Sequence, residues 1–496
     1  MINMENSVVN IESMELEEIE TESESEEIEE TMFLDKMNED EIEELYKTVE
    51  EYVNTYLEEN LQHFSSEKFT STMIHEITQE ILIDLCNLGI CSIEHDDDVE
   101  DVEEYVEEIV EEIYNIHMIP PRSESIYDEP EYTDKEINEL KEQIKQLQEL
   151  PQPAQRSTEW YTFRHQLFTA SNLWKLFSTE SQYNSLIYEK CLPINDTAVS
   201  FGTTNLTSPA HWGVKYEPIS VEIYKRRNQV EVIDLGCIQH PRYSFIGASP
   251  DGIVVSPSKM GRMLEIKNPV NRKIDGIPSE AYWIQMQLQM EVCGLDECDF
   301  LETQFREYKT EGEFWEDLEK SDDTADNKER GVLLLIIEES TESYHRPIPK
   351  YVMYPLDAEL KKEKIDEWVS MNRIEVQSMT TENTTNKQYL FIPLYWVLDI
   401  YSCVLVRRNK LWFEYVLPSI EDAWNTIVKE RKDGYEHRAP KKKIKHLSPA
   451  LLIDIHKLPA EYEFESEYVE QMEIEEPNEQ IDSTESNENI KNIILP

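Results

Sequence analysis

The chain has 496 residues, and its 104 Asp and Glu against 46 Lys and Arg give a formal net charge of -58. This balance indicates that part of the chain is disordered, although the 39% hydrophobic content can still build a core. The seven cysteines lack C-x-x-C spacing, which argues against a zinc site or a disulfide framework and favours a reducing compartment. No secretory signal or bilayer-length apolar run is present, so we expect no membrane partner.

The N-terminal third of the chain is acidic. Residues 1–35 are dense in Glu and Ser, and we expect them to be disordered. Residues 36–154 read as an acidic helical extension and linker, with one apolar helical stripe formed by Leu45, Val49, Val53 and Leu57. Two interpretations stay open: a small helical bundle that folds alone or with a partner, or an acidic extension without a specific role.

The main domain is expected over residues 155–440. Trp160 and Arg164 lie four positions apart and therefore share a helix face. Ser171 belongs to a Thr-Ala-Ser segment that resembles an N-cap for a helix over Asn172 to Phe177. A helix N-terminus, hydroxyl groups and a nearby Arg form an anion site, here for a terminal phosphate. The alternative is an ordinary capped helix with a surface Arg.

A helix is expected over His211 to Arg227, with Glu217 directly before Pro218. Proline disturbs a helix unless it opens a new one, so Glu217 is predicted to lie at a helix irregularity. The alternative is a solvated helical Glu. Val230–Gln239 and Tyr243–Val255 then read as adjacent strands.

The stretch Met263–Lys267 (MLEIK) reads as a short strand. Successive strand side chains alternate between the two faces, so Leu264 and Ile266 should enter the core while Glu265 and Lys267 emerge together on the other side. The acid and the base are thus predicted to share one place.

Asp251 lies in a Ser-Pro-Asp-Gly turn beside an apolar strand, and a hairpin through Ser256–Ser258 would bring it near Glu265. Two carboxylates suit Mg2+, which a nuclease uses to neutralise developing charge on a phosphodiester. Lys267 would orient the nucleophile or stabilise the transition state. The alternative is a surface Glu-x-Lys pair with an unrelated turn Asp.

Ser279–Cys293 reads as a helix with a polar stripe of Tyr282, Gln285 and Gln289. Glutamines at such positions can hold a water molecule or a phosphate oxygen, although an exposed helix surface is the simpler interpretation.

The rest of the chain continues the alternation of strands and helices. Strands are expected over Cys298–Tyr308 and Gly331–Glu339, with a charged loop over 316–330. A helix over Asp357–Val376, a polar loop over 379–387, a strand over Tyr395–Arg408 and a helix over Leu411–Arg431 follow. The basic stretch 431–446 suits DNA backbone binding, a nuclear address or a plain linker. Residues 441–496 are expected to be a basic stretch followed by a disordered acidic tail.

Several of these motifs occur in a familiar order. They are Trp160 and Arg164, Thr169-Ala170-Ser171, Trp212-Gly213, Tyr216-Glu217-Pro218, Pro250-Asp251-Gly252, Glu265-Ile266-Lys267, and Tyr282 with Gln285-Met286-Gln287. The order resembles the YqaJ-type viral recombinase family, the lambda-exonuclease-like branch of the PD-(D/E)xK nucleases, over residues 156–310. The later segment Trp396–Pro418 resembles an extension found in large-DNA-virus members.

The resemblance implies an α/β fold with a restriction-endonuclease-like core, in which helices flank a central mixed β-sheet. It implies an alkaline 5'-to-3' exonuclease that uses Mg2+, or Mn2+, on linear duplex DNA ends. By this resemblance, Asp251, Glu265 and Glu217 would bind the metal, and Lys267 would act on the attacking water. Gln285 and Tyr282 would lie beside the metal, and Arg164 and Ser171 would bind the 5'-phosphate.

The resemblance also implies partners and a setting. A single-strand annealing protein would use the resected DNA, the chain could form a toroidal trimer, and the compartment would be a cytoplasmic viral factory or the nucleus. Two other functions stay open: a structure-specific or restriction-like endonuclease, and an inactive scaffold whose acidic arms recruit partners. The acidic arms could also compete with DNA for basic surface at Arg262, Arg272, Lys273 and residues 431–445.

Overall fold

The computed structural model describes residues 33–92, 96–125, 129, 131–155, 157–194, 208–323, 328–339, 349–381 and 388–440. All of them belong to one compact unit that ends at Pro440. The disorder expected over 1–35 lies outside these residues except at its last three positions, which belong to the short 3-10 helix Phe33–Lys36 with Phe33 buried. The acidic tail expected beyond residue 440 lies outside them entirely.

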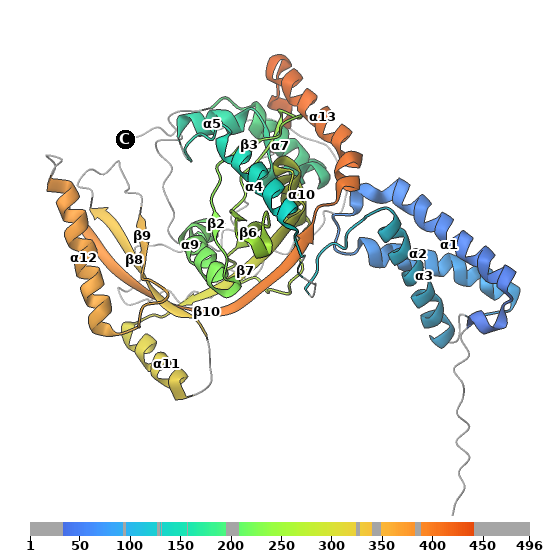
Figure 1. The fold of residues 1–496 in the computed structure, drawn as a ribbon. Helices are drawn as coiled ribbons and strands as arrows, with labels where there is room; N and C mark the ends of the chain where they lie inside the picture. Colours follow the sequence, from blue (N-terminus) through green and yellow to red (C-terminus); the bar gives the residue numbers. More distant parts are fainter. Residues whose placement is uncertain are drawn as a thin grey trace, which may run out of the picture. The chain divides into compact units, whose positions relative to one another are not determined.

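A curled, mixed sheet of seven strands organises the main domain (Figure 1), in the order β2-β5-β6-β7-β10-β8-β9. The bounds are β2 Val232–Ile233, β5 Gly252–Val254, β6 Met263–Lys267, β7 Glu297–Glu307, β8 Arg330–Glu339, β9 Lys350–Met353 and β10 Gln388–Arg407. Strands β6 and β7 are parallel and the other neighbours are antiparallel. With the helices described below, this confirms the predicted mixed sheet flanked by helices.

A second, small sheet changes the expectation for residues 230–255. It contains β1 (Phe168–Thr169), β4 (Ile246–Ala248) and β3 (Ile238–Gln239). The prediction of two long strands here was wrong, because each expected strand is divided between the two sheets. In the small sheet β3 pairs with β4, whereas in the large sheet β2 pairs with β5. Pro250 separates β4 from β5 and cannot donate a ladder hydrogen bond, so the second strand breaks there.

Two helices cover opposite faces of the large sheet. Helix α9 (Pro209–Asn228) packs Tyr224 against Leu264 and Ile266, while α10 (Glu280–Cys293) belongs to the cluster on the Met263 side. Helix α9 runs through Pro218 without a break, contrary to expectation. Val214, whose carbonyl loses its helical donor to the proline, lies on the exposed side of the helix, where water can replace that donor.

The main domain contains further helices. They are α5 (Thr158–His165), α6 (Ala170–Leu173), η3 (Trp174–Phe177), α7 (Glu180–Cys191), η4 (Pro257–Lys259), α11 (Glu311–Asp323), α12 (Lys362–Thr381), α13 (Lys410–Asp433) and η5 (Glu436–Arg438). The prediction of a charged loop over 316–330 was wrong as far as Asp323, because helix α11 extends to that residue. The buried Phe314 anchors this helix. Helix α12 also begins later than expected and continues into the first residues of the expected polar loop, while 382–387 lie outside the described residues.

The N-terminal extension is helical, as predicted. It contains η1 (Phe33–Lys36), α1 (Glu39–Asn60), η2 (Leu61–His63), α2 (Phe69–Leu88), α3 (Asp96–Ile116) and α4 (Asp134–Glu149). The predicted stripe on α1 is buried, and its side chains belong to the same hydrophobic cluster as those of α10 and α13.

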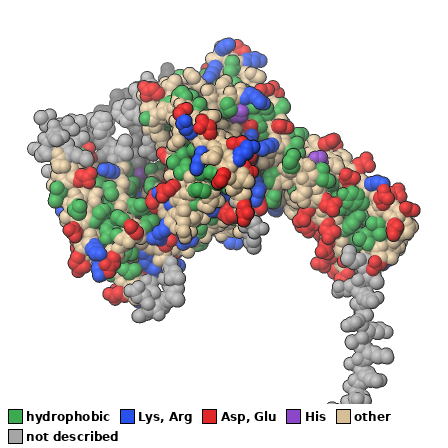
Figure 2. Space-filling view, viewed as in Figure 1, with side chains coloured by type: hydrophobic (Ala, Val, Ile, Leu, Met, Phe, Trp, Pro, Cys, Tyr) green, Lys and Arg blue, Asp and Glu red, His purple; other side chains and the backbone are tan. Residues whose placement is uncertain are grey.

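The first three helices of the extension carry an acidic surface. Lys47 is the only Lys or Arg within α1, α2 and α3, and Figure 2 shows acidic side chains spread over this part of the chain. Across the described ranges, no helix has both the length and the apolar character required to span a bilayer.

Candidate active site

Strand β6 presents one acid and one base on the face that α10 covers. Glu265 is fully buried, and the Lys267 ammonium forms an ion pair with Glu265 Oε1. Leu264 and Ile266 point to the opposite face, where they pack with Tyr224 of α9. The predicted alternation along this strand is therefore confirmed.

Asp251 reaches the same place from the neighbouring strand. Strands β5 and β6 pair with Gly252 opposite Leu264, so continuing the register by one residue sets Asp251 opposite Glu265. The Asp251 carboxylate accepts a hydrogen bond of 2.8 Å from the backbone N–H of Ile266. An added Cβ at position 252 would lie 2.4 Å from a Val232 methyl carbon, so glycine fits here without a shift of the Val232 side chain. The predicted hairpin thus brings the two acids together.

Two glutamines of helix α10 bind the Glu265 carboxylate. Gln285 donates a hydrogen bond of 2.7 Å to Glu265 Oε1, and Gln289 donates one of 2.7 Å to Glu265 Oε2. The ring of Tyr282 lies 4.8 Å from the Lys267 ammonium. Gln285 and Tyr282 were both predicted beside the site, whereas Gln289 was recognised only as part of the same helical stripe.

The charges of the site act on one another strongly. Burial raises the pKa of Asp251 well above its usual range, and the nearby charges of Glu265 and Glu217 raise it further. Burial lowers the pKa of Lys267, but the charges of Glu265 and Asp251 outweigh burial and raise that pKa above its ordinary value. The site therefore concentrates negative charge that a cation can compensate.

The oxygen atoms available here suit a hard divalent cation. Glu217, Asp251 and Glu265 are carboxylates, and the buried Oε1 atom of Gln289 has no hydrogen-bond donor among the described atoms. Oxygen donors of this kind are the ligands that Mg2+ prefers. Glu217 is exposed on α9, and in the described part of the chain no three His, Cys, Asp or Glu side chains lie together so that they could hold a metal ion. The donor chemistry fits such an ion, whereas Glu217, Asp251 and Glu265 are not gathered into one three-carboxylate group.

Arg164 lies next to this acidic centre. Its guanidinium stacks on Trp160 at 4.5 Å and lies 3.5 Å from the Ser249 hydroxyl. The Ser249 carbonyl oxygen accepts a hydrogen bond of 3.3 Å from Gln289. Ser249 thereby links Arg164 to the glutamine that holds Glu265.

Ser171 lies close to the ends of two parallel strands. Strands β1 and β4 pair in parallel; Ser249 directly follows β4, and Ser171 lies two positions after the end of β1. The Ser171 hydroxyl lies 3.3 Å from that of Thr169, and among the described residues it makes no hydrogen bond to Arg164. The helix expected at Asn172–Phe177 begins earlier, at Ala170, because Thr169 is its N-cap. It is a single turn followed by η3, not the longer helix that was expected, and the 5'-phosphate site at Arg164 and Ser171 stays a prediction.

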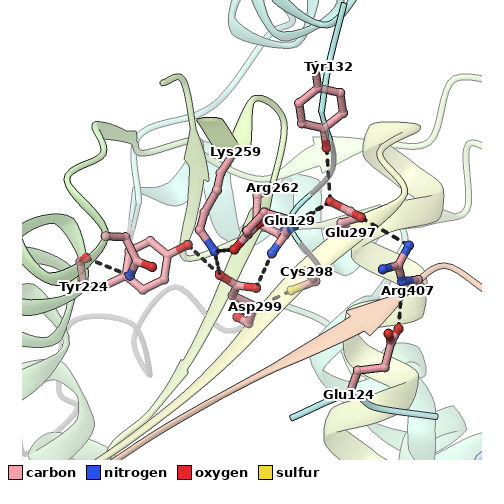
Figure 3. Close-up of polar contacts among 11 residues, drawn as sticks. Glu124, Glu129, Tyr132, Tyr224, Lys259, Arg262, Glu297, Cys298, Asp299 and Arg407 are labelled. Atoms are coloured by element: carbon pink, nitrogen blue, oxygen red, sulfur yellow. Dashed lines mark hydrogen bonds and ion pairs between the residues drawn. The ribbon is translucent and has the colours of Figure 1, made fainter. Parts of the chain in front are cut away.

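Arg262 belongs to a buried network, not to the basic surface that was expected (Figure 3). It is fully buried and pairs with Asp299 at 2.8 Å and with Glu297 at 2.8 Å. Tyr224 of α9 donates a further hydrogen bond of 2.7 Å to Asp299. Arg262 directly precedes β6, so its side chain enters the sheet where two acids of β7 receive it.

Sequence reasoning missed two polar residues that complete the site. Asn268 follows Lys267 and donates hydrogen bonds of 2.8 Å to Ser220 and 2.6 Å to Thr303, which fix the end of β6. Ser249 lay in the recognised Ser-Pro-Asp-Gly turn but was not given a role. Each lies within two positions of a recognised charged residue, and this was the only available signal for either.

Comparisons with known proteins concern the segment of the chain that carries this site. Residues 159–296 match the sequence model of the YqaJ-like viral recombinase domain. The uncharacterized protein R354 of Acanthamoeba polyphaga mimivirus is 29% identical over 313 residues, which are 57% of this chain and 54% of that protein. The chain therefore spans about half the length of this curated relative.

Two solved structures also align with the chain. One is LHK-Exo in complex with dAMP, and the other is the alkaline exonuclease LHK-Exo from Laribacter hongkongensis. They are 16% and 17% identical, each alignment covers 57% of this chain and 95% of the other, and both TM-scores are 0.28. The family match confirms, for residues 159–296, the predicted resemblance to the YqaJ-like viral recombinase family.

Proposed function

We propose that this chain is a metal-dependent deoxyribonuclease that degrades linear duplex DNA from its ends, in the 5'-to-3' direction, during viral recombination, repair or genome processing. One observation carries the proposal. Gln285 and Gln289 hold both oxygens of the buried Glu265 carboxylate, which also pairs with Lys267. Two amides that orient one carboxylate beside a second acid and a lysine form an arrangement suited to phosphodiester hydrolysis. The match to a viral recombinase domain supports the same reaction class.

Asp251, Glu265 and Glu217 would hold Mg2+ or Mn2+, and the bound cation would neutralise negative charge that develops on the scissile phosphate. Gln285 and Gln289 would keep the Glu265 carboxylate in one orientation. Lys267, placed between Glu265 and the ring of Tyr282, would direct its N–H donors to the attacking water or to the charged phosphate oxygens.

The exonuclease interpretation depends on Arg164 and Ser171. Arg164 projects beside Ser249, which Gln289 connects to the acidic centre. A 5'-phosphate bound by the Arg164 guanidinium, with Ser171 as a further donor, would set the end of the DNA at a fixed distance from the metal. Cleavage would then start at a strand end and not within the duplex.

The substrate proposal also suggests partners. A single-strand annealing protein would receive the exposed strand, and three copies of the chain would enclose the duplex. A mass measurement by light scattering, with and without duplex DNA, tests the trimer, and a constant monomer mass would contradict it.

The decisive experiment digests linear duplex DNA carrying 5'-phosphate or 5'-hydroxyl ends in Mg2+. It compares the wild type with Lys267→Ala and with Lys309→Ala, an exposed lysine that follows β7. We expect progressive loss of one strand from phosphorylated ends, a rate roughly two to three orders of magnitude lower for Lys267→Ala, and little change for Lys309→Ala. Internal cuts would support the endonuclease alternative. No cleavage by the wild type in Mg2+ or Mn2+ would leave the scaffold alternative.

A further inference from the structure

The helix that holds Glu265 is itself held at its start by the N-terminal extension. Ser65, just after η2, donates a hydrogen bond of 2.7 Å to the Glu280 carboxylate in the first turn of α10. The ring of Phe64 packs against the Trp283 ring at 5.6 Å. The Trp283 indole N–H donates a hydrogen bond of 3.1 Å to the carbonyl oxygen of Arg122. Three residues from before position 155 therefore contact the first turn of α10.

The other end of α10 is held by a different part of the extension. The Gln143 side chain of α4 donates hydrogen bonds of 2.9 Å to the Cys293 carbonyl and 2.8 Å to the Gly294 carbonyl. The last carbonyl groups of a helix have no partner within the helix, so Gln143 supplies donors that the helix lacks. Gln285 and Gln289, the two glutamines on Glu265, lie between these two attachments.

The extension is also fastened to the sheet, so it can act as a support. The N–H and carbonyl of Glu124 pair with Leu405 of β10 at 2.8 and 2.9 Å. In the buried network of Figure 3, Glu129 pairs with Arg262, and Tyr132 donates a hydrogen bond of 3.2 Å to Glu297. Part of the segment that was expected to be a linker thus binds the main domain through these contacts.

Arg122 links Ser65 to Trp283 in the first turn of α10. Its guanidinium donates hydrogen bonds of 3.1 and 3.0 Å to the Ser65 carbonyl, while its own carbonyl receives the Trp283 indole. A displacement of the extension would therefore change the contacts of the first turn of α10 directly.

We propose that the N-terminal helical extension is a positioning element for the active site: Phe64, Ser65 and Gln143 fix both ends of α10 and so hold Gln285 and Gln289 against Glu265. This inference rests on the proposed nuclease function for its kinetic consequence. It assigns the acidic extension a role within the catalytic domain. A helix displaced by a fraction of an ångström would misorient the carboxylate and slow the reaction while the DNA still binds.

The kinetic test uses the full chain with Phe64→Ala and Gln143→Ala. We expect kcat to fall roughly tenfold or more in each variant, with KM for duplex DNA little changed. Phe64→Leu, which keeps much of the apolar contact, should recover most of the rate. The matched controls are Phe33→Ala, another buried phenylalanine of the extension, and Gln152→Ala, whose side chain contacts Leu147 and Gly236. Both controls should keep the wild-type kcat.

A second readout does not depend on cleavage. Hydrogen exchange measured by peptide mass spectrometry should show lower protection over 280–293 in Phe64→Ala and Gln143→Ala, with no loss there in the two controls. Unchanged protection and unchanged kcat would overturn the inference, as would an equal loss in the controls. If the wild type cleaves no DNA but protection of α10 still depends on Phe64 and Gln143, the proposed function fails and the positioning role stands.

Discussion

The Lys190 ammonium donates a hydrogen bond of 2.7 Å to the carbonyl oxygen of Arg164. Lys190 lies at the end of α7 and is almost fully buried. Arg431 of α13 completes the arrangement by donating hydrogen bonds of 2.8 Å to the His165 carbonyl and 2.7 Å to the Lys190 carbonyl. Two cations thus satisfy carbonyl groups at the ends of α5 and α7, and they hold the helix that carries Arg164.

Lys190 should make stability depend on pH in the alkaline range. Burial, with the charges of Arg164 and Arg431, lowers the pKa of Lys190 to about 8. The unfolded chain then binds the proton more tightly than the folded chain between about pH 8 and the ordinary lysine pKa of about 10.4. Because the unfolded state holds more protons in this window, the contribution of Lys190 to the free energy of unfolding rises with pH.

We expect wild type to gain on the order of 1 kcal/mol relative to Lys190→Met between pH 7.5 and 9. Urea unfolding at both pH values measures this difference, and Lys273→Met serves as the exposed control. A difference between wild type and Lys190→Met that does not vary with pH would contradict the depressed pKa.

Arg164→Ala should remove the preference for a phosphorylated end. A charge-assisted contact to phosphate contributes about 1.5–3 kcal/mol, so the rate on 5'-phosphate ends should fall roughly 10- to 100-fold. The rate on 5'-hydroxyl ends should change little. Arg242→Ala, at an exposed arginine, provides the control. A parallel loss on both kinds of end would mean that Arg164 supports the fold and not end recognition.

The strand and hairpin that carry Asp251, Glu265 and Lys267 could be predicted because their signals are local. The period-two alternation of MLEIK sets which side chains share a face, and the Ser-Pro-Asp-Gly turn marks where β5 begins. The polar stripe on α10 could be recognised from its spacing in the same way. Its contact with Glu265 depends on how α10 packs on the sheet, and periodicity alone does not specify that packing.

Ser249 and the role of the extension could not be predicted for a related reason. The contact between Arg164 and Ser249 depends on the parallel pairing of β1 and β4, strands of two and three residues that are too short to show a period. Gln143 reaches the end of α10 across about 150 positions of sequence, and nothing in either segment marks the other. Such contacts arise from tertiary packing, where local propensity carries little information.

Gln285 and Gln289 should matter for the rate, whereas Gln287 on the same helix should matter for stability. Gln289→Ala removes the donor to Glu265 Oε2, and loss of a residue that orients a ligand typically costs roughly 10- to 100-fold in activity or metal affinity. Gln287 is buried and instead donates to the Arg407 carbonyl at 2.9 Å and accepts from the Asn409 N–H at 2.7 Å.

Gln287→Ala leaves those two backbone groups unpaired and should cost about 1–3 kcal/mol of stability with kcat unchanged. Steady-state kinetics and thermal unfolding of Gln285→Ala, Gln287→Ala and Gln289→Ala separate the two effects. An equal loss of kcat in all three would indicate that α10 responds to any glutamine substitution.

Arg262 should act on stability and not on DNA binding. Its guanidinium compensates Asp299 and Glu297 at 2.8 Å, so Arg262→Met leaves Asp299 to Lys259 at 3.7 Å and Glu297 to Arg407 at 3.6 Å. Breaking a buried ion pair by removing one partner typically destabilises by about 3–5 kcal/mol, and the double variant Arg262→Met with Asp299→Asn should recover part of that loss. Urea unfolding measures both effects.

DNA affinity of the folded fraction, followed at several salt concentrations, should match wild type for Arg262→Met, because a fully buried guanidinium releases no counterions from the phosphate backbone. A weaker salt dependence in Arg262→Met would instead indicate that this side chain reaches the DNA.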